Sequence, residues 1–306
     1  MKPVFSIITP AYNRAELLRE TAASILHQTF TAWEFIVVDD GSKDHTADVM
    51  KELMAQDSRI RYVYQENAER SAARNNGARH AQGQYLCFLD SDDYFQPTYL
   101  EKLFHFLEGQ QFPNGLVVCA FYEWMGGDAL VPVQEPAPEK PWADWLCLWP
   151  VSPSRACVSK AAFDTVTFRE DIVIVEDTVL WVTLVRDFPL FYFPERLIQY
   201  RVHEGNSVNR ASKAAFSRFA GLKKFFATEA SSEISPKVKA FLLSDVVFRM
   251  AEYENAHGRK GAAFSLVLQS LAYQWKNQFL KTRLFFLCEL MPGFSFLWQK
   301  LRPAKP

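Results

Sequence analysis

The sequence lacks the two glycine-rich signatures that mark the most familiar nucleotide-binding folds. No GxGxxG follows the first predicted strand, and GxxxxGK followed by Ser or Thr occurs nowhere in the 306 residues. A dinucleotide-dependent oxidoreductase and a P-loop NTPase are therefore poor interpretations. If a nucleotide binds, carboxylates, a metal ion and aromatic or backbone contacts must hold it.

A surplus of charge and a long apolar segment are also missing. The net charge is −1, whereas a dedicated nucleic-acid binder usually carries a basic surplus. No run of about 18 uncharged apolar residues exists, so no transmembrane helix is predicted. The first residues show no signal-peptide architecture, and we expect a cytoplasmic protein.

Paired cysteines are absent as well. The five cysteines never form a CxxC pair, and several lie in apolar runs. This pattern favours buried free thiols in a reducing compartment over disulfides or a zinc site. The cysteines are Cys87, Cys119, Cys147, Cys157 and Cys288.

An acidic turn at the end of a predicted buried strand is the most informative feature present. The mostly apolar residues 85–89 run directly into Asp90, Ser91, Asp92 and Asp93. Three carboxylates this close repel one another unless something positive sits between them. A hard divalent ion such as Mg²⁺ or Mn²⁺ is the simplest guest. The alternative is a solvated turn that caps the helix starting near Pro97.

Strands and helices alternate through the first half of the chain. Apolar runs predict strands over residues 4–9, 34–39, 60–64, 85–90 and 116–121. Helices are predicted over residues 15–28, 44–56, 71–81 and 97–108. The first has helical apolar spacing, the second has a capping residue at its start, and the third is rich in Ala, Arg and Asn. This alternation predicts an α/β domain with a mainly parallel sheet and right-handed crossovers.

Polar residues follow three of these strands, at 9–13, 39–42 and 90–93. In open α/β sheets the ligand crevice lies beyond the carboxyl ends of the strands. We therefore expect the three segments to converge on one site. Chance polarity of surface loops is the alternative.

A second acidic pair, Glu176 and Asp177, opens a predicted helix that continues to about Arg186. Acids in a first helical turn are also favoured by the helix dipole, so capping alone can explain them.

Three tryptophans, Trp142, Trp145 and Trp149, follow a Pro-rich extended loop at residues 131–141. Amphipathic packing explains them simply. The alternative is an aromatic wall for the apolar face of a sugar.

After about Ala211 the pattern is helical only, with predicted helices at 216–228, 237–256 and 261–281. From Arg259 onward, Lys and Arg greatly outnumber the single acidic residue, Glu289, and they are mixed with aromatic residues. Such a segment is typical of a membrane-surface helix, although packing on the first domain or on a second subunit explains it equally well.

Together, five short motifs resemble family 2 glycosyltransferases, the inverting enzymes of the GT-A fold. They lie at residues 6–14, 38–44, 71–75, 88–93 and 176–177, and the match covers about residues 4–209. The resemblance implies a Rossmann-like GT-A catalytic domain at 1–209. A helical extension at 210–306 would contact a membrane or a subunit.

The resemblance assigns a nucleotide-diphospho-sugar donor, most often a UDP-sugar, to the loops. Thr9, Pro10 and Tyr12 would line the base and ribose, and Asp39 and Asp40 would accept hydrogen bonds from them. The donor-binding set implied by the resemblance is Thr9, Pro10, Tyr12, Asn13, Asp39, Asp40, Arg74, Ser91, Asp93 and His203.

The resemblance also implies the catalytic roles. Asp92 and Asp90 match the positions that hold the divalent metal, Mn²⁺ or Mg²⁺, and Asp93 would face the sugar. Asp177 matches the base that takes the proton of the acceptor hydroxyl, with Glu176 as a supporting group. His203 resembles a position that contacts the diphosphate or metal, but it is explained almost as well as a structural histidine.

The sequence departs from processive relatives because it lacks the QxxRW signature. We therefore expect addition of one or a few sugars to a saccharide or lipid-linked acceptor, in surface polysaccharide or glycan synthesis on the inner face of the membrane. The sequence leaves open whether the chain forms a homo-oligomer.

Two other functions are the alternatives to a glycosyltransferase: a non-catalytic nucleotide-sugar-binding protein and a sugar-phosphate nucleotidyltransferase. The second would need a glycine-rich loop that residues 9–14 do not provide.

Overall fold

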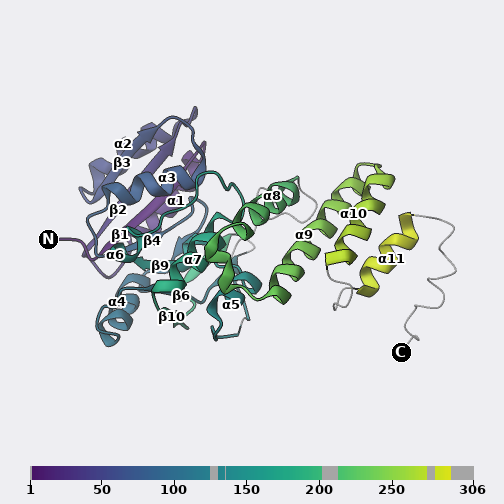
Figure 1. Ribbon diagram of the computed structural model, residues 1–306. Helices are drawn as coiled ribbons and strands as arrows, with labels where there is room; N and C mark the ends of the chain where they lie inside the picture. The colour runs from purple at the N-terminus through teal and green to yellow at the C-terminus, as the bar shows by residue number, and fades with distance from the viewer. Residues whose placement is uncertain (1, 125–129, 135, 202–212, 274–279, 291–306) are drawn as a thin grey trace. The chain divides into compact units, whose positions relative to one another are not determined.

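The computed structural model describes residues 2–124, 130–134, 136–201, 213–273 and 280–290 (Figure 1). The chain forms two compact units, Met1–His203 and Glu204–Pro306. The boundary expected at 209–210 falls among residues 202–212, outside the described ranges. Each unit is described by itself.

A seven-stranded sheet forms the centre of the first unit. Its spatial order is β10 (Leu190–Phe193), β6 (Leu116–Cys119), β9 (Ala156–Ser159), β4 (Tyr85–Phe88), β1 (Phe5–Ala11), β2 (Trp33–Asp40) and β3 (Ile60–Gln65). All neighbouring strands pair in parallel except β9, which runs antiparallel to both β4 and β6. The mainly parallel sheet is thus confirmed, and the carboxyl ends of β1, β2 and β4 meet at one edge.

Seven α-helices and one short 3₁₀-helix belong to this unit among the described residues. They are α1 (Ala15–Leu26), α2 (Thr46–Gln56), α3 (Glu69–His80), α4 (Tyr99–Gly109), α5 (Trp142–Leu148), η1 (Pro153–Arg155), α6 (Lys160–Phe163) and α7 (Glu176–Asp187).

Helix α3 packs closely on β1 and β2 (Figure 1). Gly77 permits the close approach, because a Cβ there would lie 2.5 Å from Ile8 Cγ2 and 3.2 Å from Val38 Cγ2. The polar residues of α3 therefore lie near the carboxyl ends of these strands.

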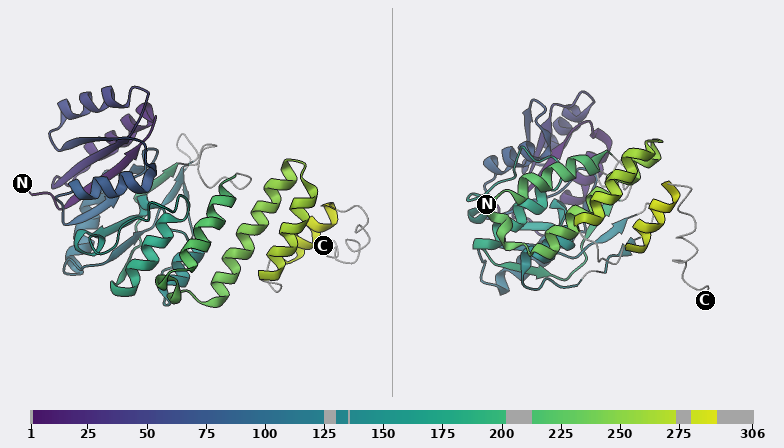
Figure 2. Two further views of the ribbon diagram at one scale, coloured as in Figure 1. Left: turned by 45° about the horizontal axis from the view of Figure 1, so that its top comes forward. Right: turned by 45° about the vertical axis from the view of Figure 1, so that its right-hand side comes forward.

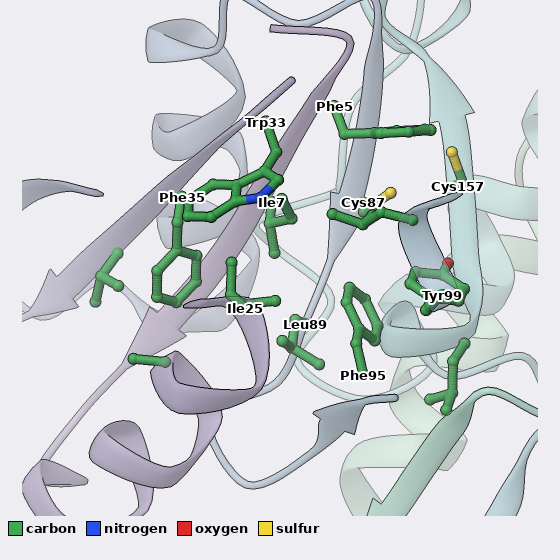
Figure 3. Packing of buried hydrophobic residues seen from close by; sticks show 14 of the residues in the cluster. Phe5, Ile7, Ile25, Trp33, Phe35, Cys87, Leu89, Phe95, Tyr99 and Cys157 are labelled. Atoms are coloured by element: carbon green, nitrogen blue, oxygen red, sulfur yellow. The ribbon is translucent and has the colours of Figure 1, made fainter. Parts of the chain in front are cut away.

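The core between sheet and helices is apolar and aromatic (Figure 3). Phe5, Ile7 and Phe35 are fully buried there, and Cys87 and Cys157 belong to the same cluster, with Phe5 lying near both of them. The predicted free thiols are confirmed for the four described cysteine side chains, all of which are buried. The side chain of Cys288 lies outside the described residues.

A second, four-stranded sheet was not predicted. Its order is β5 (Tyr94–Phe95), β11 (Ile198–Arg201), β7 (Tyr122–Trp124) and β8 (Leu130–Pro132). Strand β5 begins directly after Asp93 and pairs antiparallel with β11. The acidic turn therefore joins the two sheets and has β11 beside it.

The second unit is helical, as predicted. Its described elements are α8 (Ala214–Phe226), η2 (Glu229–Glu233), α9 (Pro236–Ala256), α10 (Lys260–Tyr273) and α11 (Leu280–Leu290). Helix α9 packs against α8 and α10, and α10 packs against α11 (Figure 2). None of the described helices combines the length and apolar character of a membrane span.

Candidate active site

Asp90 opens the acidic turn and is bonded through both its side chain and its backbone. Its Oδ1 accepts a hydrogen bond from Arg74 Nη2 at 2.6 Å. Its backbone N–H donates to Ser154 Oγ at 3.0 Å, and its carbonyl accepts from Asp93 N at 3.0 Å. Because the Asp90 side chain is 28% exposed, it can still meet a ligand.

Asp93 is placed differently, because its side chain is buried. Only 1% of the residue is exposed. Its Oδ2 accepts from Ser154 Oγ at 2.5 Å, and its Oδ1 accepts from the Arg201 backbone N–H at 3.1 Å. Burial, and then the charges of Asp90 and Asp92, raise the pKa of Asp93 well above its usual range. Ser91, also buried, accepts from Thr21 Oγ1 through its carbonyl at 2.9 Å.

Arg74 connects the acidic turn to the second acidic pair. Its guanidinium is 2% exposed and donates from Nη1 to Glu176 Oε1 at 3.2 Å, while Nη2 bonds Asp90. Burial lowers the pKa of Arg74, but the charges of Asp90 and Glu176 outweigh this and raise it overall. Two acidic motifs far apart in the sequence are thus held by one permanent cation.

Glu176 and Asp177 have different environments although they are neighbours. Glu176 is 4% exposed. Burial, followed by the charge of Asp177, raises its pKa to about 7, against the opposing charges of Arg74 and Arg70. Asp177 is partly exposed, and its Oδ1 accepts from Thr178 N at 2.6 Å. A buried acid beside a more open one is the arrangement that separates acid and base roles.

The backbone before this pair is strained. Val175 has φ 72° and ψ 13°, in the left-handed region that β-branched residues rarely adopt. Such a conformation costs about 1–3 kcal/mol and persists where surrounding contacts impose it. Here it sets the direction in which α7 starts, and hence where Glu176 and Asp177 lie.

Asn75 fixes the segment that leads into α7. Its Nδ2 donates to the Phe168 carbonyl and to Glu170 Oε1, both at 2.9 Å. Its Oδ1 accepts from Phe168 N at 3.0 Å. Arg74 of α3 therefore bonds both acidic motifs, and the adjacent Asn75 bonds the segment that precedes the second one. The sequence marked Asn75 only as part of the motif at 71–75.

Asp39 and Asp40, at the end of β2, are buried and hydrogen-bonded. Asp39 accepts from Ser42 N at 2.8 Å and from Tyr62 Oη at 2.6 Å. Burial, and then Asp39, raise the pKa of Tyr62, so its hydroxyl remains a donor. Asp40 accepts from Gln65 Nε2 at 2.7 Å and from Ala68 N at 2.8 Å. Each carboxylate oxygen can accept more than one bond, so capacity for a ligand remains.

The residues that follow β1 range from buried to open. Thr9 is fully buried, and its Oγ1 has no hydrogen-bond partner within the described part of the chain. Pro10 is half-buried, and Tyr12 is 46% exposed. Tyr12 therefore presents the aromatic face that a base could meet.

Asn13 ties the loop after β1 to the loop after β2. Its backbone N–H donates to Ser42 Oγ at 2.9 Å, and its Oδ1 accepts from Lys43 N at 2.8 Å. Asp44 reaches back and accepts from Ala15 N at 3.1 Å. Two of the three predicted segments thus form one connected surface.

The tryptophans after the Pro-rich loop differ in exposure, and Trp142 is half-buried. Trp145 is 4% exposed, and its Nε1 donates to the Pro136 carbonyl at 3.1 Å. Trp149 is 39% exposed. Packing therefore accounts for Trp145, and of these two only Trp149 presents a face to solvent.

The acidic turn offers oxygen ligands suited to a hard cation. The described residues contain no group of three or more His, Cys, Asp or Glu side chains arranged to hold a metal. Mg²⁺ and similar ions are often bound by one or two carboxylates and completed by substrate phosphates and water. Asp90 and Asp92 fit that requirement. His203 lies outside the described residues.

Comparison with known proteins identifies the fold and the family. The glycosyl transferase family 2 model matches residues 6–140. An uncharacterized glycosyltransferase of Rickettsia typhi is 30% identical over 220 residues, covering 68% of this chain and 67% of that protein. The putative teichuronic acid biosynthesis glycosyltransferase TuaG of Bacillus subtilis is 43% identical over 107 residues, which are 35% of this chain but only 42% of TuaG.

Solved structures show the fold. S. aureus TarS 1–349 in complex with UDP-GlcNAc superposes with a TM-score of 0.61 at 16% identity, covering all of this chain and 93% of that one. The mannosyltransferase PcManGT from Pyrobaculum calidifontis, in complex with GDP-Man and Mn²⁺, gives a TM-score of 0.58 at 18% identity, covering 98% and 88%. The predicted GT-A fold is confirmed, and the chain belongs to glycosyl transferase family 2.

Proposed function

We propose that this protein is an inverting, metal-dependent glycosyltransferase. It transfers a sugar from a nucleotide-diphospho-sugar, most simply a UDP-sugar, to a hydroxyl of a saccharide or lipid-linked saccharide. The observation that carries the proposal is the position of Arg74, which bonds Asp90 at 2.6 Å and Glu176 at 3.2 Å. Arg74 is thus shared by Asp90, which is assigned to the metal and the donor diphosphate, and Glu176, which is assigned to catalysis.

In the proposed reaction Asp177 is the base. The acceptor oxygen attacks the anomeric carbon as the bond from that carbon to the diphosphate oxygen breaks. The acceptor proton passes to the Asp177 carboxylate, and the nucleoside diphosphate leaves with the bonding electrons. Glu176 lies beside the base and, through Arg74, keeps positive charge near the departing diphosphate.

Asp92 and Asp90 would hold the divalent metal, Mn²⁺ or Mg²⁺. The ion neutralises charge on the leaving diphosphate when it is bound. The PcManGT complex, which contains Mn²⁺ and GDP-Man, supports metal use by proteins of this fold.

The connected loops after β1 and β2 would bind the donor nucleotide. Asp39 and Asp40 suit N–H and O–H donors of a base and ribose, because ionised carboxylates only accept. Thr9, Pro10, Tyr12 and Asn13 complete this side, with Arg74 and Ser91 toward the diphosphate. The TarS complexes with UDP and UDP-GlcNAc support a nucleotide-sugar as the donor. The roles given to these residues, and to His203, remain predictions.

The acceptor is proposed to be a growing surface polysaccharide or glycan. The name of TuaG, a putative teichuronic acid biosynthesis enzyme, supports this class. The missing QxxRW signature supports transfer of one or a few sugars.

The base assignment is tested by Asp177→Asn. A screen of nucleotide-sugars for donor hydrolysis first identifies the donor, and turnover with that donor is then compared. We expect Asp177→Asn to lower kcat by about 10²–10⁴-fold, with nucleotide affinity unchanged, because it removes general-base catalysis. Asp187→Asn, at the other end of α7 and exposed, is the matched control. Near-normal turnover of Asp177→Asn would exclude Asp177 as the base.

Residues after 259 are proposed to bind an anionic membrane surface from the cytoplasmic side, where a lipid-linked acceptor would lie. Lys300→Glu, Arg302→Glu and Lys305→Glu together should lower flotation with vesicles of anionic lipid, because each basic residue near such a surface contributes about 1 kcal/mol. Full-length protein is required, since removing α10 would uncover the face of α9 on which it packs. A matched triple reversal at Lys2, Lys51 and Lys102 should leave flotation unchanged. Equal flotation of the two triple variants would remove the proposal.

A further inference from the structure

The hydroxyl of Ser154 is fully buried between two members of the acidic turn. It accepts a hydrogen bond from the backbone N–H of Asp90 at 3.0 Å and donates one to Asp93 Oδ2 at 2.5 Å. Ser154 comes from η1, which packs against β4 and β11. Because it is fully buried, Ser154 cannot touch a ligand itself, and any effect on one must pass through Asp90 and Asp93.

The acidic turn is held from three sides by groups of different kinds. From α1, Thr21 Oγ1 donates to the carbonyls of Ser91 at 2.9 Å and Asp93 at 3.1 Å. From α3, Arg74 holds the Asp90 carboxylate. Ser154, from η1, is the third side chain, and it alone of these three bonds both the first and the last acid of the turn.

We propose that Ser154 is a positioning residue for the metal ligands, acting by fixing the backbone of the turn that carries Asp90 and Asp92. This inference rests on the proposed metal dependence. Its physical basis is that removing the hydroxyl takes the acceptor from the Asp90 N–H and the donor from Oδ2 of the buried Asp93 carboxylate. The turn then relaxes, and the spacing of the two metal-binding carboxylates is no longer imposed.

The buried carboxylate of Asp93 completes this arrangement. Its second oxygen accepts from the Arg201 backbone N–H at 3.1 Å and so ties the turn to β11. The pair Ser154–Asp93 therefore links η1, the acidic turn and the second sheet. Asp93 belongs to the support of the metal-binding turn in this proposal, and the sugar-facing role implied by the resemblance is replaced.

The test measures metal binding directly. MnCl₂ is titrated into wild type and Ser154→Ala in the presence of UDP or GDP, whichever wild type binds more tightly, and free Mn²⁺ is followed by electron paramagnetic resonance. Loss of an outer-shell partner should weaken Mn²⁺ binding about 10- to 100-fold. Ser159→Ala is the matched control, because Ser159 is equally buried and accepts two backbone N–H groups, of Gly115 and Ala162, away from the turn.

Two further variants keep the test decisive if Ser154→Ala does not fold. Ser154→Cys keeps a side chain of similar shape with weaker hydrogen bonds and should weaken Mn²⁺ binding in the same direction. Asp93→Asn can still bond Ser154 and Arg201, with its amide donating to the hydroxyl, and should lose less affinity than Asp93→Ala. Mn²⁺ affinity in both Ser154 variants equal to that of Ser159→Ala would overturn the inference. Wild type that binds no Mn²⁺ with either nucleotide would instead overturn the proposed metal dependence, and this inference with it.

Discussion

Helices α3 and α10 differ in how their composition relates to their burial: the polar helix buries polar side chains, and the apolar helix leaves an apolar side chain exposed. Helix α3 is polar in sequence, yet it buries Ser71, Arg74 and Asn75. Helix α10 is rich in apolar residues, yet Leu268 is 48% exposed and only Ala263, Val267, Ser270 and Leu271 are buried. A helix formed only to fill a core would not bury an arginine and an asparagine, because each needs partners inside the protein. Arg74 finds its partners in Asp90 and Glu176, and Asn75 finds them in Phe168 and Glu170.

The two units of the chain also differ in net charge. Residues 1–203 carry 18 Lys and Arg against 28 Asp and Glu, whereas residues 204–306 carry 16 against 7. The near-neutral total hides this division. The first unit is therefore acidic overall and the helical unit is basic.

The largest expected effect is that of Arg74→Met. The variant removes the cation that the acids at 90 and 176 share inside a mostly buried site, although Arg70 Nε still lies 3.7 Å from Glu176 Oε1. We expect the free energy of unfolding to fall by about 3–5 kcal/mol, as for other buried ion pairs that lose one partner. Urea denaturation followed by circular dichroism measures the change.

The double variant Arg74→Met/Glu176→Gln is the control for this effect. It removes both members of one buried pair, so it should recover part of the lost stability. If the single and double variants are equally unstable, burial of the arginine stem rather than its charge holds the two motifs.

Leu271→Ala should have the next largest effect, confined to the helical unit. Leu271 is 4% exposed in the cluster that α10 forms with α9 and α11, and its truncation should cost about 2–5 kcal/mol. Leu268→Ala, on the exposed side of the same helix, should stay within about 0.5 kcal/mol. Nucleotide affinity, measured by calorimetry, should be unchanged in both. A loss of affinity in Leu271→Ala would show that the helical unit supports the donor site.

Glu176→Gln should change the pH dependence of stability. The pKa of Glu176 is raised to about 7 in the folded protein from an ordinary 4.5, so between these values the folded state binds more protons than the unfolded state. Stability contributed by this group therefore falls as pH rises from about 4.5 to 7. The variant should show a shallower decline across that window, with a residual slope from Asp93, whose pKa is also raised. Parallel curves for wild type and variant would show that Glu176 titrates normally.

The parallel part of the fold was predictable from local sequence. Strands β1, β2 and β4 are apolar runs that end in polar residues, and α1 and α2 carry clear helical periodicity. Strand β9 was missed because four residues have no periodicity and its partners lie far away in the sequence. The second sheet was missed because β5, β7 and β8 have two or three residues each.

Residues of the candidate site were predictable where they belong to a local sequence motif. Residues that join the site only through a contact with another element were not. The convergence of the segments after β1 and β2 follows from parallel strands and is supported by the Asn13 and Asp44 hydrogen bonds. Tyr62, Gln65 and Ser154 have no local signal. Each acquires a role only through a partner on another element, so a single sequence does not mark it.

The link between the loops after β1 and β2 has a consequence for binding kinetics. Asp44 accepts the N–H groups of both Ala15 and Thr46, at the start of α1 and α2, while Asn13 is bonded to Ser42 and Lys43. The two loops therefore behave as one preorganised surface. A ligand that meets both loses less conformational entropy of the protein on binding than it would with independent loops. Its association should follow a single exponential without a slow rearrangement phase.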